Sequence, residues 1–282
     1  MLYYFNNEFL PAQDIRISPN DRGFLFGDGA YEVIRSYNGN LFCLDEHLER
    51  LAKSLTKLEI IVPDLNNLEN IINRIAGENH ASDMDALIYI QVTRGSYSQR
   101  TLLPFSKEIV PTIFVCSSLY EPPFKEMEDG IKIITEEDIR WSRCDIKSIS
   151  LAGNVLGTLK ASQVGAKETI WVRNGYITEG THTNIMAVKN GMVYTPPLSN
   201  FILDGITRRT VLKICENLGI KYFEKNIKES ELISFDEMML TATSLEITPV
   251  IQVNDWFVND TLMGGIVGKL QENFKKLTKN PK

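Results

Sequence analysis

Histidine is scarce in this sequence of 282 residues. Only 3 histidines occur, at His47, His80 and His182, and their positions lack the short spacing of a metal-ligand set. We therefore expect no metal centre that is built on histidine.

Cysteine is also infrequent, and no Cys-x-x-Cys pair is present. The 4 cysteines lie far apart, at Cys43, Cys116, Cys144 and Cys215. This spacing argues against a zinc ribbon and against a disulfide framework. We expect four buried thiols.

Long apolar runs are missing too. No apolar stretch approaches the ~18 residues that a membrane-spanning helix needs. Residues 1–8 contain neither the basic region nor the long apolar segment of a signal peptide. The 30 basic and 36 acidic side chains give a formal charge of −6, which repels a nucleic-acid backbone on average. We expect a cytoplasmic protein with no membrane partner and no nucleic-acid partner.

The composition is that of a soluble globular chain, with 43% hydrophobic, 23% charged and 9% aromatic residues. Its length supports two domains of ~150 residues each. A polar stretch that contains Pro122 and Pro123 is the best boundary. We therefore predict a small N-terminal α+β domain, a linker and a larger C-terminal domain, at residues 1–118, 119–128 and 129–282.

Within the first domain, the pattern predicts a strand at residues 30–37, a hairpin turn at Asn38-Gly39 and a returning strand at residues 40–44. Asp45 can cap the helix that comes next. A second helix and two core strands follow, at residues 64–79, 87–94 and 111–116.

The second domain interleaves strands and helices, with tight turns at Asn174-Gly175 and Asn190-Gly191. Its predicted helices lie at residues 151–166, 205–217 and 262–277, and Gly219 closes the second of them.

Three segments carry residues that suit chemistry. In the first, residues 21–35, glycines permit a backbone kink directly before a strand that projects Tyr31, Val33 and Arg35 from one face. That face can line a pocket. The alternative is a glycine-rich turn that leads into an ordinary, half-buried strand.

The second segment, residues 138–148, places Lys147 before a largely apolar helix. Desolvation lowers the pKa of an ammonium group and frees the amine for a Schiff base with an aldehyde cofactor. The alternative is a lysine whose charged end reaches solvent.

The third segment, residues 178–184, surrounds Glu179 with hydroxyl and amide groups that can orient it or bind phosphate. Farther along, residues 204–208 open a helix whose first N–H groups can bind an anion. The alternatives are a solvated loop carboxylate and a helix start that binds nothing.

Together these segments resemble the class IV (fold-type IV) pyridoxal-phosphate aminotransferases, and most closely the D-amino-acid aminotransferases. The resemblance extends over nearly the whole chain and includes residues 46–51 and 246–250. It implies a two-domain α+β fold with a smaller N-terminal domain, a larger C-terminal domain of mixed and antiparallel strands, and pyridoxal 5'-phosphate between them.

The resemblance also implies roles for single residues. Lys147 would form the Schiff base and move the proton, Glu179 would keep the pyridine nitrogen protonated, and Tyr31 would lie near the Schiff base. Arg50 would bind the phosphate; its alternative is an ion pair with Glu46 on a solvated helix. The other phosphate contacts would come from Ile206, Thr207 and Thr243.

The substrate loop departs from the pattern of D-amino-acid enzymes. That family usually presents an Arg-x-His loop after Thr-Arg-Gly, whereas residues 99–101 here read Gln-Arg-Thr. Arg35 or Arg100 would then bind the substrate carboxylate, and the fixed direction of a strand residue makes Arg35 the safer candidate. The full set of expected substrate contacts is Tyr31, Val33, Arg35, Arg100, Arg140 and His182.

The main functional hypothesis is transamination between an amino acid, most readily a D-amino acid, and a 2-oxo acid. The alternatives within the superfamily are a branched-chain L-amino-acid transaminase, an (R)-amine transaminase and 4-amino-4-deoxychorismate lyase, which would release pyruvate without an amino acceptor. A binding module without activity is a further alternative. The resemblance also implies a homodimer that shares its active site between subunits.

Overall fold

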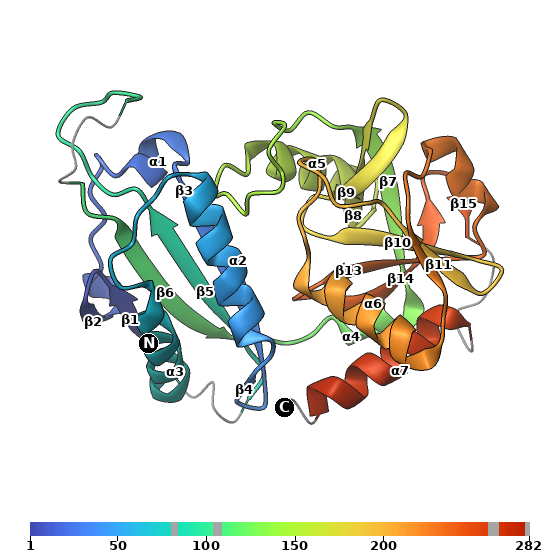
Figure 1. The fold of residues 1–282 in the computed structure, drawn as a ribbon, viewed down its shortest axis with the longest axis horizontal. Coiled ribbons are helices and arrows are strands. Elements are labelled where there is room, and N and C mark those ends of the chain that lie inside the picture. Colours follow the sequence, from blue (N-terminus) through green and yellow to red (C-terminus); the bar gives the residue numbers. More distant parts are fainter. Residues whose placement is uncertain (80–83, 104–108, 259–264, 280–282) are drawn as a thin grey trace. The chain divides into compact units, whose positions relative to one another are not determined.

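The computed structural model describes residues 1–79, 84–103, 109–258 and 265–279, and the chain divides into two compact units (Figure 1). The first unit comprises Met1–Glu121 and Ile146–Leu151, and the second contains Pro122–Asp145 and Ala152–Asn280. The division after Glu121 falls inside the stretch that the sequence indicates as a linker. Residues 146–151 pack with the first unit because their backbone pairs with the start of a strand there, through Ile149 N–H and Gly29 C=O.

The first unit contains a six-stranded sheet in the order β2-β1-β6-β5-β3-β4, and all of its pairs are antiparallel. The strands are β1 Leu2–Phe5, β2 Glu8–Pro11, β3 Gly29–Tyr37, β4 Asn40–Leu41, β5 Ala86–Thr93 and β6 Thr112–Leu119. The helices are η1 Ala12–Asp14, α1 Arg22–Phe26, α2 Leu44–Lys57, η2 Leu65–Asn67 and α3 Leu68–Glu78.

Helices α2 and α3 cover one face of this sheet (Figure 1). Because strand side chains alternate, Ile88, Ile90 and Val92 of β5 face the helices and are fully buried. Tyr89 and Gln91 lie on the opposite face and are only half-buried. The sheet therefore has a core face and a second face on which Tyr31 also lies.

The predicted hairpin is confirmed, but two local details differ. The returning strand β4 ends at Leu41, and the helix begins at Leu44 after Cys43, whose φ of 53° is left-handed. The prediction that Asp45 caps this helix is wrong, since Asp45 lies in the first turn. There its carboxylate still interacts favourably with the helix dipole.

Helix α1 was not expected from the sequence. Asp21 caps it by accepting a hydrogen bond from the N–H of Gly23 at 2.8 Å, and Gly27 ends it with a φ of 66°. The predicted glycine kink is thus a short helix, which is closed by a glycine in the left-handed conformation.

The second unit contains a nine-stranded mixed sheet in the order β12-β11-β10-β13-β14-β7-β8-β9, with β15 paired to β14. The strands are β7 Ile131–Glu137, β8 Glu168–Arg173, β9 Tyr176–Gly180, β10 Asn184–Lys189, β11 Met192–Thr195, β12 Tyr222–Glu224, β13 Glu237–Ala242, β14 Glu246–Val253 and β15 Trp256–Phe257. The helices are α4 Phe124–Asp129, α5 Ala152–Gln163, α6 Ile206–Leu218, η3 Glu229–Ser234 and α7 Ile266–Lys279.

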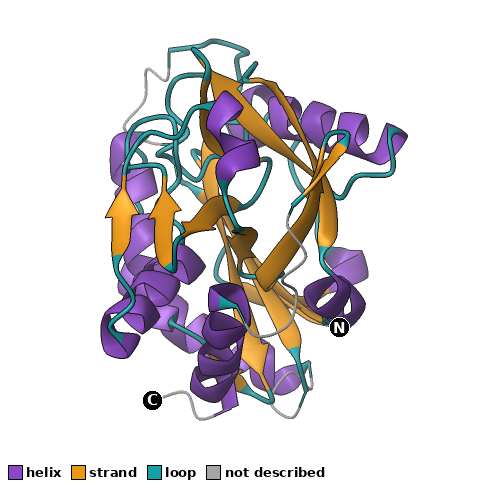
Figure 2. Ribbon diagram, turned by 90° about the vertical axis from the view of Figure 1, so that its right-hand side faces the viewer, coloured by secondary structure: helices purple, strands orange, loops and turns teal. Residues whose placement is uncertain are grey.

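The three helices that the sequence predicts in this unit are present as α5, α6 and α7. Gly219 ends α6 with a φ of 66°, as predicted. The first residues of the predicted helix at 262–277 lie outside the described residues. Each unit combines helices with a sheet, so the predicted α+β class is confirmed (Figure 2).

The cysteines are all free thiols. Cys144 and Cys215 are buried, as predicted, but the prediction is wrong for Cys43 and Cys116, which are half-buried. Cys43 lies at the turn before α2, and Cys116 belongs to β6. Among the helices that the structure describes, none is long and apolar enough to cross a membrane.

Candidate functional site

Lys147 lies in the first unit, next to Tyr31. The Tyr31 N–H donates to the carbonyl oxygen of Lys147 at 3.0 Å, and the Lys147 N–H donates to Ser54 Oγ at 3.2 Å. The Lys147 Nζ lies 4.3 Å from the centroid of the Tyr31 ring. Two backbone contacts therefore hold the lysine, and its amine lies against a phenol.

Arg50 is buried in the same unit and is held by Glu32. Its Nε donates to Glu32 Oε1 at 2.7 Å, and its Nη2 donates to Glu32 Oε2 at 2.9 Å. The Nδ1 of His47 lies 2.8 Å from the same Oε2. The alternative that Arg50 lies on a solvated helix face is wrong, because Arg50 is only 7% exposed.

Electrostatics keep this cluster charged. Burial by itself would raise the pKa of the Glu32 carboxyl, but the charge and hydrogen bonds of Arg50, assisted by His47, outweigh burial and hold this pKa well below its usual value. Burial also lowers the pKa of His47, against the opposing effect of Glu32. At neutral pH the cluster is an ion pair beside a neutral imidazole.

Sequence reasoning gave no role to Glu32 or His47. The alternation of side chains along a strand could have indicated a role for Glu32. Glu32 follows Tyr31 and therefore points to the opposite face of β3, where α2 packs.

Glu179 belongs to the second unit, where it lies on β9 and is 5% exposed. Its Oε1 accepts a hydrogen bond from Arg140 Nη1 at 2.7 Å. Its Oε2 accepts from the Leu203 N–H at 2.8 Å and from Asn184 Nδ2 at 3.4 Å. Arg140 donates at the same time to Asp138, from Nε to Oδ1 at 3.0 Å. Arg140 is therefore shared between two carboxylates.

This sharing leaves Glu179 less well compensated than Glu32. Burial raises the pKa of Glu179, and Arg140 offsets that effect only in part. Burial would lower the pKa of Arg140, but the hydrogen bonds and charges of its acidic neighbours raise it. A further cationic N–H beside Glu179 would stabilise its ionised form, which is what a protonated pyridine nitrogen offers.

The start of α6 supplies features that suit an anion. Gly205 precedes the helix without a side-chain cap, and the N–H groups of Ile206 and Thr207 have no partner within the helix. Thr241, on the adjacent β13, has a buried hydroxyl without a hydrogen-bond partner in the part of the chain that the structure describes. Thr243 lies in the turn after β13. These groups fit a phosphate.

The expected substrate residues have different environments. Val33 is half-buried and lies on the same strand face as Tyr31. Arg35 is 1% exposed, and its Nη2 donates to Asp85 Oδ2 at 2.6 Å. The guanidinium of Arg35 also lies over the rings of two tyrosines. Arg35 therefore makes a structural ion pair with Asp85.

Two other candidates are exposed. The guanidinium of Arg100 lies 5.1 Å from the centroid of the Phe26 ring, near the surface of the first unit. His182 is about half exposed, and its Nδ1 lies 3.1 Å from Glu168 Oε2.

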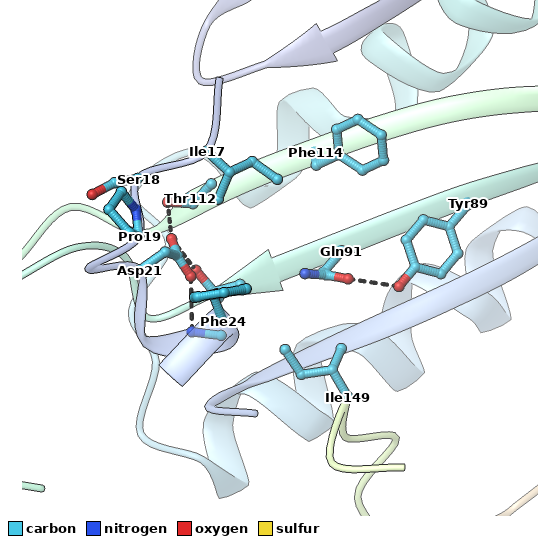
Figure 3. A pocket seen from close by; sticks show the side chains of 12 residues that line it. Ile17, Ser18, Pro19, Asp21, Phe24, Tyr89, Gln91, Thr112, Phe114 and Ile149 are labelled. Atoms are coloured by element: carbon cyan, nitrogen blue, oxygen red, sulfur yellow. Dashed lines mark hydrogen bonds between the residues drawn. The ribbon is translucent and has the colours of Figure 1, made fainter. Parts of the chain in front are cut away.

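A cavity of about 620 Å³ lies in the first unit, on the sheet face that carries Tyr31 (Figure 3). Tyr89 and Gln91 extend into it and are joined by a hydrogen bond of 2.7 Å from the phenol to the amide oxygen. The Tyr89 ring centroid is 5.8 Å from that of Tyr31. Burial raises the pKa of Tyr89 to about 12, so the phenol stays protonated. The sequence indicates a pocket on this face, but Tyr31, Val33 and Arg35 are not among the residues that line this cavity. Its lining residues are brought together by strand pairing.

The family of the chain follows from its similarity to known proteins. The model of the amino-transferase class IV family matches residues 29–253. The chain belongs to this family. Class IV aminotransferases use pyridoxal 5'-phosphate, so the resemblance inferred from the sequence and the cofactor that it implies are confirmed.

Two similar relatives are D-alanine aminotransferases. The protein from Staphylococcus epidermidis is 39% identical over 97% of this chain and 96% of its own length. The protein from Staphylococcus aureus is 40% identical with the same shares of the two chains covered. The branched-chain amino acid aminotransferase of Escherichia coli has the same fold, with a TM-score of 0.92 and 24% identity over 98% of this chain and 94% of the other.

Proposed function

We propose that this pyridoxal-phosphate-dependent aminotransferase transfers amino groups between D-amino acids and 2-oxo acids. The observation that carries the substrate class is the identity of about 40% with D-alanine aminotransferases over nearly the whole chain. The environment of Lys147 and Glu179 supports the chemistry.

When bound, pyridoxal phosphate supplies an aldehyde carbon for a lysine amine and a protonated ring that withdraws electrons from the substrate. Lys147 would hold that carbon, and its Nζ would move the proton from the substrate α-carbon. Tyr31, whose ring lies against this amine, would orient it. Two hydrogen bonds hold the main chain of Lys147, and its Nζ lies against the Tyr31 ring, which supports these roles.

Glu179 would accept the N–H of the pyridine ring. Its ionised form is only partly compensated by Arg140, so a cationic ring nitrogen would complete its environment. Arg140 would thus serve the site through Glu179, and its expected contact with substrate remains a proposal.

Arg50 would bind the phosphate, because Glu32 fixes the plane of its guanidinium through two hydrogen bonds. The N–H groups of Ile206 and Thr207 would share the negative charge with Thr243. The buried hydroxyl of Thr241 is a further donor of suitable chemistry.

For the substrate carboxylate we propose Arg100 ahead of Arg35. The Arg35 guanidinium is buried against Asp85 and two tyrosine rings, whereas Arg100 is exposed on the loop that departs from the family pattern. Tyr31, Val33 and His182 would contact the rest of the substrate.

A branched-chain amino-acid transaminase is the second candidate, favoured by the close likeness in fold to the Escherichia coli enzyme. The two are separated by a panel of amino donors, in which the half-reaction is followed with D-alanine, L-leucine, (R)-1-phenylethylamine and aminodeoxychorismate. We expect D-alanine to react fastest. A faster reaction with L-leucine would contradict the proposal, and pyruvate release from aminodeoxychorismate without an acceptor would indicate a lyase.

We further propose that the protein is a homodimer with an active site shared between subunits. The support is the family resemblance alone. A cytoplasmic location and the lack of nucleic-acid and membrane partners stay predictions from the sequence.

A further inference from the structure

Glu168 is a buried carboxylate that the proposed chemistry does not use. It is the first residue of β8, and it is 1% exposed. Its two oxygens receive hydrogen bonds from the turn that joins β9 to β10, residues 181–183.

Donors of several kinds converge on this carboxylate. Oε1 accepts from the N–H of Thr181 at 3.0 Å and from its hydroxyl at 2.6 Å. Oε1 also accepts from the N–H of Thr169 at 2.8 Å. Oε2 accepts from the hydroxyl of Thr183 at 3.1 Å and lies 3.1 Å from His182 Nδ1. The donors of the turn are buried away from water, so without this anion they would have no hydrogen-bond acceptor.

The turn is packed tightly around the carboxylate. The N–H of Gly180 donates to the carbonyl oxygen of Thr183 at 2.8 Å, which closes the turn. A Cβ at Gly180 would lie 2.0 Å from Thr183 Oγ1 and 2.9 Å from Glu168 Oε2. The turn therefore has little space to shift while Glu168 remains in place.

This turn lies between Glu179, which the proposed function needs, and Asn184, which contacts Glu179. Glu179 precedes Gly180, and Asn184 follows Thr183. The Asn184 amide donates to Glu179 Oε2 at 3.4 Å and to the carbonyl oxygen of Leu203 at 3.0 Å. A Cβ at Gly205 would lie 2.0 Å from Asn184 Oδ1, so Asn184 packs directly against the start of α6. The turn thus fixes the Glu179 carboxylate relative to the start of α6.

We propose that Glu168 is a positioning residue, which holds the 181–183 turn so that Glu179 keeps its place toward the cofactor's ring nitrogen. The inference rests on the proposed function. Glu168 acts through Glu179 and does not touch the cofactor, so the two residues should be coupled.

The test is a double-mutant cycle of Glu168→Gln and Glu179→Gln. Glutamine keeps the shape of Glu168, removes its charge and turns one acceptor into a donor that faces other donors. Two properties are measured on protein saturated with cofactor: the ¹⁵N signal of pyridoxal phosphate labelled at the ring nitrogen, and the single-turnover rate with D-alanine.

We expect Glu168→Gln to shift the ¹⁵N signal toward that of a neutral ring and to slow the half-reaction roughly tenfold, as is typical when an orienting partner is lost. The double variant should be no slower than Glu179→Gln alone, within about twofold, because both changes act at one carboxylate. A role confined to stability would leave the ¹⁵N signal of the folded variant unchanged.

Glu136→Gln is the matched control, because it makes the same chemical change in the second unit, at a surface ion pair with Lys160. It should leave both properties unchanged. If Glu168→Gln does not fold, Thr183→Val removes one donor to the carboxylate with similar shape and should shift the ¹⁵N signal in the same direction.

A wild-type ¹⁵N signal in folded Glu168→Gln, or in Thr183→Val where Glu168→Gln fails to fold, would overturn the inference. Losses of rate that add in the double variant would do the same. Failure of the wild-type protein to transaminate D-alanine would instead contradict the proposed function.

Discussion

Buried carboxylates in this protein differ in how fully their charge is compensated. Glu32 receives two hydrogen bonds from one guanidinium and a third from His47, and its pKa is lowered despite burial. Glu179 receives one from Arg140, which is shared with Asp138, and its pKa is raised. Because a partly compensated carboxylate attracts a further cation, Glu179 is suited to bind a ligand, whereas Glu32 is suited to hold a side chain.

Lys147→Ala should abolish covalent attachment of the cofactor and with it turnover, because alanine has no amine to bind the aldehyde carbon. Borohydride reduction of the wild-type holoenzyme followed by peptide mapping should place the label on Lys147. A label on any other lysine would contradict the assignment.

Glu179→Gln should leave the cofactor bound and slow the half-reaction on the order of 100-fold, because a neutral amide stabilises a cationic ring less than a carboxylate does. The variant should therefore keep its affinity for the cofactor while its single-turnover rate falls. Wild-type single-turnover rates at saturating cofactor would show that Glu179 is only a structural residue.

At the level of secondary structure, β3 uses its two faces for different purposes. Glu32 points toward α2 and holds Arg50, while Tyr31 and Val33 point to the other face, where Lys147 lies against Tyr31. At the end of the strand, Arg35 is buried against Asp85. One strand therefore orders the arginine that we propose for the phosphate, contacts the Lys147 amine and contributes a structural ion pair.

Glu32→Gln should lower the free energy of unfolding by about 3 kcal/mol at pH 7, because it leaves the buried Arg50 without its anion. It should also weaken the binding of pyridoxal phosphate to the apoprotein. The pKa of Glu32 is depressed in the folded state, so its contribution is fully present above the unfolded value of about 4.3 and is lost as the pH falls below it.

Denaturant unfolding of wild type and Glu32→Gln between pH 7 and pH 3 checks this prediction. The stability difference between the two should shrink as the pH falls. A difference that stays constant or grows toward pH 3 would contradict the assigned ion pair.

Arg35→Ala should act mainly on stability, with a loss of about 3 kcal/mol, since Asp85 would keep its charge without the arginine. Its half-reaction rates with D-alanine and with (R)-1-phenylethylamine should fall by similar factors, if at all. A loss of rate confined to D-alanine, the substrate with a carboxylate, would indicate that Arg35 binds the substrate carboxylate.

In the whole molecule, the chain crosses from the second unit into the first for residues 146–151 and then returns. Lys147 therefore belongs to the unit of Tyr31 and Arg50, while Glu179 and the start of α6 belong to the other. The proposed roles therefore fall on residues of both units, so tests of function need the complete chain.

Arg100→Ala and Lys147→Ala should complement each other if Arg100 serves the site of the partner subunit. Each homodimer should be inactive or weakly active toward D-alanine, whereas the co-expressed hybrid contains one site with both side chains intact. The measurement is the activity toward D-alanine of the purified hybrid, whose molar mass should be twice that of the chain. A hybrid with no more activity than the two parents would contradict sharing through Arg100.

The sequence by itself determined the local structure and the identity of the chemical groups. Hairpin turns, helix ends such as Gly219 and the apolar periods depend on neighbouring residues, so they could be predicted. The motifs around Lys147, Glu179 and Arg50 also indicated the family, because their residue types and order are specific. The prediction of a cap at Asp45 was wrong because several nearby residues can begin a helix.

Only the tertiary structure decided which groups meet. Glu32 and Arg50 are brought together by the packing of α2 on β3, and Arg35 meets Asp85 because β3 pairs with β5. Glu168 reaches the turn after Glu179 through the pairing of β8 with β9. Burial and long-range pairing set these contacts and the lowered pKa of Glu32, and neither is encoded in the spacing of a short motif.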